Sequence, residues 1–339
     1  MTGREEIIIR LAVIPDIPDI MRFIKENWKA DHIFANDREF FEYMFVDGEE
    51  VHYVVARGEE SNIIYGCVGF VKYNSMDMPD VSGMMLRVLK SPNVFLGVEV
   101  NDAILYFNNP RFSFGLGMNT KTSGKIERLR GIESGKMVHY YRLCDRPEYK
   151  IAKILYKSIL PVSKSGRKLL PVHSFLEFDA AVDDKYLHQK TPYKDKKYLK
   201  HRYFEHPIYI YDCLAIADDD EKTGSVIITR TIEHENARVL RIIDFLGRDE
   251  DLSGIGYALD DIMKRNQYEY ADCYCVGLGE EIMKKAGFIR RTEEDTNIIP
   301  NYFEPFEQKN VDIYYSVGKG ENIYLFKGDS DQDRPNYRR

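Results

Sequence analysis

The 339-residue sequence has little of several features that would mark particular protein classes. It has one tryptophan, and its five cysteines are an odd number that complete disulfide pairing would not use. It lacks an apolar run near the roughly 18 residues that a membrane helix requires. Its formal net charge of -7 argues against non-specific nucleic-acid binding, which depends on clustered positive charge. We therefore expect a folded soluble protein with no nucleic-acid partner and no membrane insertion.

The cysteines also argue against a disulfide or metal framework. They lie mostly in apolar, strand-like stretches, as Cys67, Cys144, Cys213, Cys273 and Cys275. Buried, reduced thiols fit a cytoplasmic protein best, and the first residues lack the apolar core of a signal peptide. Alternation places Cys273 and Cys275 on one strand face with no second ligand pair nearby, so core packing explains them better than a metal site. We expect no metal.

Aromatic residues, in contrast, are abundant. The chain has 24 tyrosines and 18 phenylalanines, and it is 44% hydrophobic and 30% charged. Tyrosine combines an apolar ring with a polar tip, which suits a partly wet cleft for a polar organic ligand, although ordinary sheets also contain tyrosine. The length is comfortable for two domains.

The stretch most typical of a binding site spans residues 238–288. An apolar strand at 239–246 is followed by the polar turn 247–252, and then by Ser253-Gly254-Ile255-Gly256. Helical spacing follows from Tyr257, and a second strand is predicted at 271–276. A strand, a glycine-containing loop and a helix N-terminus together form an anion site, because free backbone N–H groups and the helix dipole favour negative charge.

The first half alternates strands and helices. Its predicted strands are 7–12, 52–57, 63–71, 84–89, 112–118 and 136–143, and its predicted helices are 20–28, 37–45, 97–107 and 123–129. A proline- and glycine-containing linker with several basic residues follows at 157–171. The end of the chain, 323–336, is an apolar strand running into a dense polar set, which predicts either a loop folded back on a cleft or a disordered end.

This order resembles the GNAT superfamily of N-acyltransferases. The resemblance rests on Arg10-Leu11-Ala12 before the first helix, the hairpin ending in Tyr65-Gly66-Cys67-Val68-Gly69-Phe70, and residues 120–132 followed by a strand. It implies an α/β (α+β) fold with two GNAT-like domains in tandem, each a mixed, mostly antiparallel sheet flanked by helices. The expected division is an N-terminal domain at 1–150, a linker at 151–171 and a C-terminal domain at 172–339.

The resemblance also implies a cofactor, acetyl-CoA or another acyl-CoA. The family's loop, R/Q-x-x-G-x-G/A, corresponds to Val94–Glu99 in the first half, where Glu99 replaces the second glycine, and to Asp251–Gly256 in the second. We therefore expect the second half to bind the cofactor. Two residues depart from the family pattern: Asp251 adds negative charge, and Met283 stands where many members have a tyrosine that acts as general acid for the departing thiolate. The expected cofactor-binding residues are Phe245, Leu246, Leu252, Ser253, Gly254, Ile255 and Gly256.

Asp244, on the strand before this loop, is the predicted general base, because a carboxylate there could deprotonate an acceptor amine. An exposed strand-end carboxylate is the alternative interpretation. Five residues are predicted to contact substrate, two from the helix-to-helix region of the first half and three from the polar tail: Trp28, His32, Asp329, Asp331 and Arg334. Packing for Trp28 and a surface or capping role for His32 are the competing interpretations.

The resemblance implies acyl-CoA-dependent N-acylation of an amino sugar, with a nucleotide-linked sugar as the expected form, as in GNAT-type proteins of bacterial surface-polysaccharide biosynthesis. The amine would attack the thioester directly, and backbone N–H groups of the splayed strand would hold the oxyanion. The alternatives are a FemABX-like aminoacyl transferase, against which the absence of a long helical arm argues, and a non-catalytic binding protein. The sequence leaves open whether the chain forms a homodimer.

Overall fold

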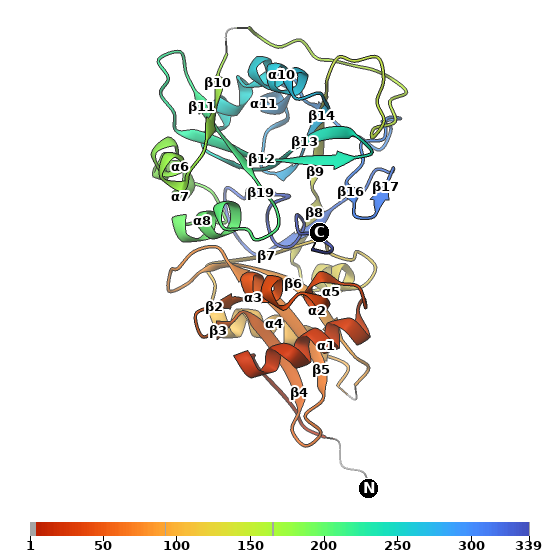
Figure 1. The fold of residues 1–339 in the computed structure, drawn as a ribbon. Coiled ribbons are helices and arrows are strands. Elements are labelled where there is room, and N and C mark those ends of the chain that lie inside the picture. Colours follow the sequence, from red (N-terminus) through yellow and green to blue (C-terminus); the bar gives the residue numbers. More distant parts are fainter. Residues whose placement is uncertain (1–4, 92, 165, 339) are drawn as a thin grey trace.

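The structure, a computed structural model, describes residues 5–91, 93–164 and 166–338, which form two mixed sheets flanked by helices (Figure 1). The first sheet has the strand order β1-β4-β5-β6-β7-β18-β8, and the second β10-β11-β12-β13-β14-β9-β15 with β19 paired to β14. This confirms the predicted α/β class. Within the described ranges, no helix has the length and apolar character needed to cross a membrane.

The first half follows the predicted order closely. Asp37, the first residue of the predicted helix 37–45, is its N-cap: its side chain accepts a hydrogen bond from the Phe40 N–H, and the helix spans Arg38–Phe45. The elements are β1 Ile7–Leu11, the short 3-10 turn Ile14–Asp16, α1 Ile17–Asn27, α2 Ile33–Asn36, α3 Arg38–Phe45, β2 Val46–Asp47, β3 Glu50–Val51, β4 Tyr53–Gly58, β5 Ile64–Lys72, β6 Asp80–Val88, α4 Leu96–Asn108, β7 Phe112–Leu116, α5 Ser123–Leu129, β8 Glu133–Lys136 and β9 Val138–Leu143.

The second half builds its sheet in the same manner, with helices between its strands. Its elements are β10 Lys168–Val172, α6 Phe175–Ala181, α7 Asp184–His188, α8 Lys196–Phe204, β11 Asp212–Ala217, β12 Ser225–His234, β13 Ala237–Leu246, α9 Asp249–Ser253, α10 Gly256–Arg265, β14 Tyr268–Val276, α11 Glu280–Lys285, β15 Ile289–Arg290, β16 Tyr302–Phe303, β17 Phe306–Glu307, β18 Tyr314–Val317 and β19 Leu325–Phe326.

The two halves exchange strands. β9, from the first half, pairs with β14 and β15 of the second sheet, and β18, from the second half, lies between β7 and β8 of the first sheet. The predicted strand at 136–143 corresponds to β9, whereas Lys136 is the last residue of β8, a separate strand of the other sheet that was not predicted. Alternation of side chains continues across this segment, so periodicity carries no sign of the change of sheet. The division at residues 151–171 stays a prediction.

Each sheet contains one parallel pair of neighbouring strands that separate along their length. β6 and β7 pair from Asp80–Phe112 to Gly83–Gly115, and β13 and β14 pair as far as Ile242–Cys273. In each case a helix follows the first strand of the pair: α4 follows β6, and the short α9 and then α10 follow β13. The divergence creates a backbone groove in each sheet next to a helix N-terminus, which is the geometry that a phosphate-bearing ligand favours.

Candidate active site: two backbone grooves and a charged pocket

The groove of the second sheet is filled by the chain itself. Beyond the last β13–β14 pair, β19 pairs antiparallel with β14 at Cys275–Phe326 and Val276–Leu325. On the other side, the Gly328 N–H donates to the Ile243 carbonyl oxygen of β13 at 2.9 Å. The segment that contains β19 therefore occupies the space between the two diverging strands (Figure 1).

The glycine loop that follows β13 is covered by the linker. A Cβ atom on Gly256 would lie 2.5 Å from Val162 Cγ1 and 2.7 Å from the Ala286 carbonyl oxygen. The Arg167 N–H donates to the Gly254 carbonyl at 3.0 Å, and the Arg167 guanidinium forms an ion pair with Asp251 at 2.7 Å. Close packing of the linker thus gives a structural reason for both glycines.

The predicted cofactor-binding residues lie at the end of β13 and in the segment 252–256 that follows it, and their role stays a prediction. Phe245, Leu252 and Ile255 are buried in the apolar cluster that includes Leu259 and Met263 of α10, and Leu246 is buried in a different cluster. Gly256 is buried as well, and Ser253 and Gly254 are partly accessible. In this conformation, binding acyl-CoA here would require both β19 and the linker to move away.

The predicted base, Asp244, is fully buried. Its Oδ2 atom accepts hydrogen bonds from Lys194 Nζ at 2.6 Å and from the Tyr203 hydroxyl at 2.7 Å, and its Oδ1 atom accepts from the Phe245 N–H. Lys194 also forms an ion pair with Asp329 at 2.7 Å. Burial raises the pKa of Asp329 to about 6 against the opposing effect of Lys194. This geometry makes Asp244 part of a buried charged cluster, and its role as general base stays a prediction.

The groove of the first sheet differs from the second. Among the described residues, β6 pairs only with β5 and β7, and no strand enters between β6 and β7 beyond Gly83. Met85 has a left-handed φ of 58°, and the register with β5 shifts nearby, so the strand bulges where it leaves β7. Strand β7 ends at Leu116, one residue beyond the last pair at Gly83–Gly115, so among the described residues this edge of β6 has no neighbouring strand from Met84 onward.

The N-terminus of α4 lies directly after this groove. Asn93 Oδ1 accepts a hydrogen bond from the Phe95 N–H, and its Nδ2 donates to the exposed Glu99 carboxylate at 2.7 Å. A Cβ atom on Gly97 would make only ordinary contact, with Val88 Cγ2 at 3.7 Å. Space is therefore present beside the first turn of α4, unlike that of α10, while Glu99 keeps a negative charge nearby.

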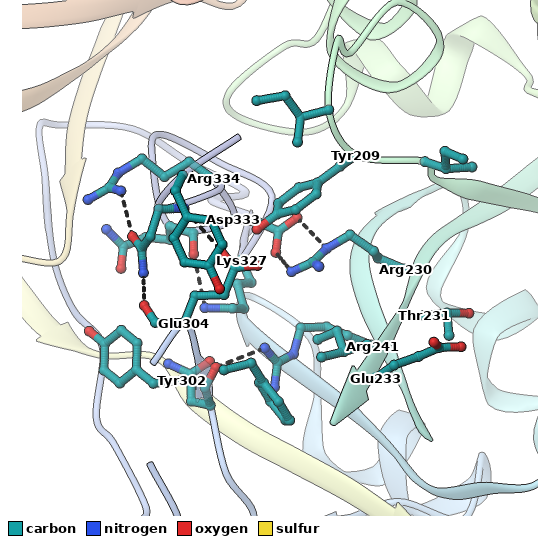
Figure 2. A pocket seen from close by; sticks show the side chains of 18 of the residues that line it. Tyr209, Arg230, Thr231, Glu233, Arg241, Tyr302, Glu304, Lys327, Asp333 and Arg334 are labelled. Atoms are coloured by element: carbon teal, nitrogen blue, oxygen red, sulfur yellow. Dashed lines mark hydrogen bonds and ion pairs between the residues drawn. The ribbon is translucent and has the colours of Figure 1, made fainter. Parts of the chain in front are cut away.

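A pocket of about 710 Å³ lies where the C-terminal tail crosses the second sheet (Figure 2). Its walls come from β12, β13, the loop before β11, the β16 region and the tail. The residues labelled in Figure 2 are Tyr209, Arg230, Thr231, Glu233, Arg241, Tyr302, Glu304, Lys327, Asp333 and Arg334. The volume is in the range of small-molecule sites.

The structure brings together some of the predicted substrate residues. Asp331 and Arg334 line the pocket and form an ion pair at 3.2 Å, whereas Asp329 is buried outside it. His32 is also buried, and burial together with Arg334 lowers its pKa to about 3. Its Nδ1 atom accepts from the Phe34 N–H, which is the capping role of the competing interpretation, and its predicted contact with substrate stays a prediction. Trp28 ends α1 with 45% of its surface exposed and does not line the pocket.

Of the cationic residues that line this pocket, only Arg334 was predicted from the sequence; Arg230, Arg241 and Lys327 are among those that were missed. Arg230 and Arg241 are charged residues within apolar strands, and Lys327 follows the apolar β19. Buried charges are rare unless they are paired or bind a ligand, so an arginine inside an apolar run is the signal that could have found them. Arg230 pairs with Asp333 at 2.6 Å, and Arg241 pairs with Asp272 at 2.7 Å.

No family model matches the sequence, and no curated protein matches it. Solved structures do resemble it. A GCN5-related N-acetyltransferase from Anabaena variabilis has a TM-score of 0.56 and 9% identity, over 92% of this chain and 72% of that chain. A probable N-acyltransferase from Enterococcus faecalis has a TM-score of 0.54 and 11% identity, over the same shares of 92% and 72%.

A third similar structure is a region of a fungal multi-domain GH3 β-N-acetylglucosaminidase that is described as a GCN5-related glucosamine N-acetyltransferase. It has a TM-score of 0.53 and 12% identity, over 93% of this chain and 38% of that chain. At such identities the likeness concerns the fold. The predicted GNAT-type fold is confirmed, and the acyl-CoA chemistry follows as a proposal.

Proposed function

We propose that the chain is an acyl-CoA-dependent N-acyltransferase whose cofactor binds in the first half, between β6 and β7. The observation that carries this proposal is the contrast between the grooves: β19 fills the second, whereas no described strand enters the first. The proposal moves the cofactor from the half that the sequence favoured, because the second groove is used for internal packing. In the sequence, Gly254 and Gly256 fit a phosphate-binding loop and a close contact with the linker equally well.

The fold suggests the chemistry. The thioester carbonyl would lie beside the open edge of β6, where backbone N–H groups can stabilise the oxyanion that forms on attack. The acceptor amine would form a C–N bond with the acyl carbon, the C–S bond would break, and the CoA thiolate would leave with the proton that the amine releases. The CoA phosphates would lie at the first turn of α4, where the helix dipole favours them.

The acceptor that we propose is an amino sugar. Support comes from the polar, tyrosine-lined pocket that the tail forms, and from the structural neighbour whose description names glucosamine. A nucleotide-linked sugar and a role in surface-polysaccharide biosynthesis rest on the sequence resemblance alone.

Gly97→Glu tests the cofactor site. The substitution adds a second carboxylate, after Glu99, at the first turn of α4, where a Cβ atom on residue 97 makes only ordinary contact, so repulsion of the CoA phosphates should weaken acetyl-CoA binding while the unfolding midpoint stays close to that of the wild type. Tyr106→Glu is the matched control, because Tyr106 is exposed near the other end of the same helix. Isothermal titration calorimetry measures both.

The wild type must bind acetyl-CoA, and its failure to do so would contradict the proposed activity and favour a non-catalytic binding protein. Normal binding by Gly97→Glu would instead place the cofactor elsewhere while leaving the activity standing.

A further inference from the structure

The floor of the pocket contains one cation without a carboxylate partner. Arg230 and Arg241 are each held by a bidentate carboxylate, Asp333 and Asp272. Lys327 forms no ion pair with any described residue, and the hydrogen bond that its Nζ donates goes to the Gln332 carbonyl oxygen at 3.0 Å. An ammonium group has three donors, so Lys327 retains capacity for a ligand.

A buried acceptor lies in the same pocket. Asn301 is 4% exposed, and its Oδ1 atom is buried without a hydrogen-bond partner among the described residues. Its backbone carbonyl, in contrast, accepts from Arg241 at 3.2 Å. An unpaired buried amide oxygen costs free energy unless a ligand or water donates to it, so Asn301 Oδ1 can accept a hydrogen bond from a hydroxyl or amine of a ligand.

The walls suit a ring with polar substituents. Tyr209, Tyr302 and Phe303 line the pocket, and the Arg230 guanidinium stacks on the Tyr209 ring at 4.0 Å. Flat apolar faces beside polar tips are typical of sites that bind small polar organic molecules. A simple inorganic ion would use Lys327 and leave Asn301 and these aromatic walls without function.

We propose that this pocket binds a sugar that bears an anionic ester, a phosphate or a sugar–nucleotide diphosphate, with the ester at Lys327 and a hydroxyl or amine at Asn301. The proposal rests on the proposed N-acyltransferase function only in that the sugar would be the amine-bearing acceptor. Occupancy of the pocket itself does not depend on acyl-CoA.

The electrostatics agree with the geometry. Burial, with Arg241 and Arg230 nearby, lowers the pKa of Lys327 to about 7, although Asp333 and Asp272 favour its charged form. The Tyr274 ring lies 5.7 Å from the ammonium. An anion at this position favours the protonated lysine, so binding should take up a proton at neutral pH and above.

Calorimetry of the full chain with glucosamine 6-phosphate, without acyl-CoA, tests the proposal. We expect binding to the wild type and a loss of about tenfold to a hundredfold in Lys327→Met, the usual cost of a hydrogen bond to a charged group. Lys222→Met is the matched control, since the Lys222 side chain is 77% exposed in the 218–222 turn. Asn301→Asp keeps the shape of the side chain but adds negative charge, and it should also weaken binding.

Three further ligands identify the bound chemistry. Comparison of UDP-glucose with glucosamine 6-phosphate shows whether the pocket prefers a sugar–nucleotide diphosphate or a sugar monophosphate. We expect both to bind more tightly than glucosamine, which has no phosphate. Inorganic phosphate should bind more weakly than the sugar esters. Equal affinity for inorganic phosphate would overturn the sugar assignment, and wild-type affinity in both pocket variants would overturn the site.

The pH dependence supplies an independent readout. Glucose 6-sulfate has an ester of constant charge and no amine, so its affinity should be full below the Lys327 pKa and fall as the pH rises above about 7, and Lys327→Met should abolish that dependence. A pH-independent wild type would contradict the role of Lys327. Displacement of the ester by CoA would assign the pocket to the cofactor, whereas unchanged ester binding in Gly97→Glu would keep the two sites separate.

Discussion

At the residue scale, buried charge organises the centre of the molecule. Lys194 lies between Asp244 and Asp329, and all three side chains are almost fully buried. Asp244 comes from β13, Lys194 from the segment before α8, and Asp329 from the tail, so the cluster ties the tail to the second sheet. Charges in such a place are stable only when each retains its partner.

Asp244→Asn separates the two roles open to this residue. If Asp244 serves mainly in the charged cluster, the substitution should lower the free energy of unfolding by about 3–5 kcal/mol, the usual cost of breaking a buried pair. Chemical denaturation measures this. A variant of unchanged stability that binds acetyl-CoA but does not turn over would restore Asp244 as the general base.

The sequence analysis singled out residues of the tail that line the pocket, but not the strand residues that line it. Asp331 and Arg334 were predicted from their polar setting after an apolar strand, and both line the pocket. Arg230 and Arg241 were not, because alternation identifies a strand face but does not reveal which segment distant in sequence will cover it. Their carboxylate partners lie 103 and 31 residues away.

At the element scale, local patterns were predicted well and pairings poorly. Helix α5 begins and ends at the predicted residues, and α4 differs by one residue at each end. Of the apolar strand predicted from residue 323, only Leu325–Phe326 forms a strand, β19. Nothing in the local sequence indicated that it would pair within the second sheet. Periodicity reports which face of an element is buried, whereas the neighbouring strand depends on the whole chain.

Gly256→Ala tests whether the second glycine loop serves packing. The added Cβ would press on Val162 and on the backbone oxygen of Ala286, so we expect a loss of about 1–3 kcal/mol of stability with acetyl-CoA affinity unchanged. Val162→Ala in the same chain should recover part of that loss, because it removes the nearer contact. Thermal unfolding and calorimetry of the single and double variants give both quantities. A stable Gly256→Ala variant that no longer bound acetyl-CoA would return the cofactor to the second half.

At the scale of the whole molecule, the halves share both strands and core. One apolar cluster joins residues of the first half, including Tyr73 and Phe114, to Tyr203 and Ile243 of the second. Tyr43 also donates to the His201 carbonyl at 2.8 Å, and Asn74 Nδ2 donates to the Tyr193 carbonyl at 3.0 Å. Because β9 and β18 each complete the sheet of the other half, neither sheet can keep all of its strands when the other unfolds.

This arrangement predicts a single unfolding transition. Trp28 is the only tryptophan and lies in the first half, so its fluorescence reports on that half, whereas far-UV circular dichroism reports on the entire chain. Leu259→Ala removes a buried side chain from α10, which packs in a cluster centred on the second sheet, and should cost about 2–5 kcal/mol. We expect the Trp28 midpoint in denaturant to fall together with the circular dichroism midpoint. An unchanged Trp28 transition would show that the first half unfolds independently, and the exchanged strands would then contribute little to coupling between the sheets.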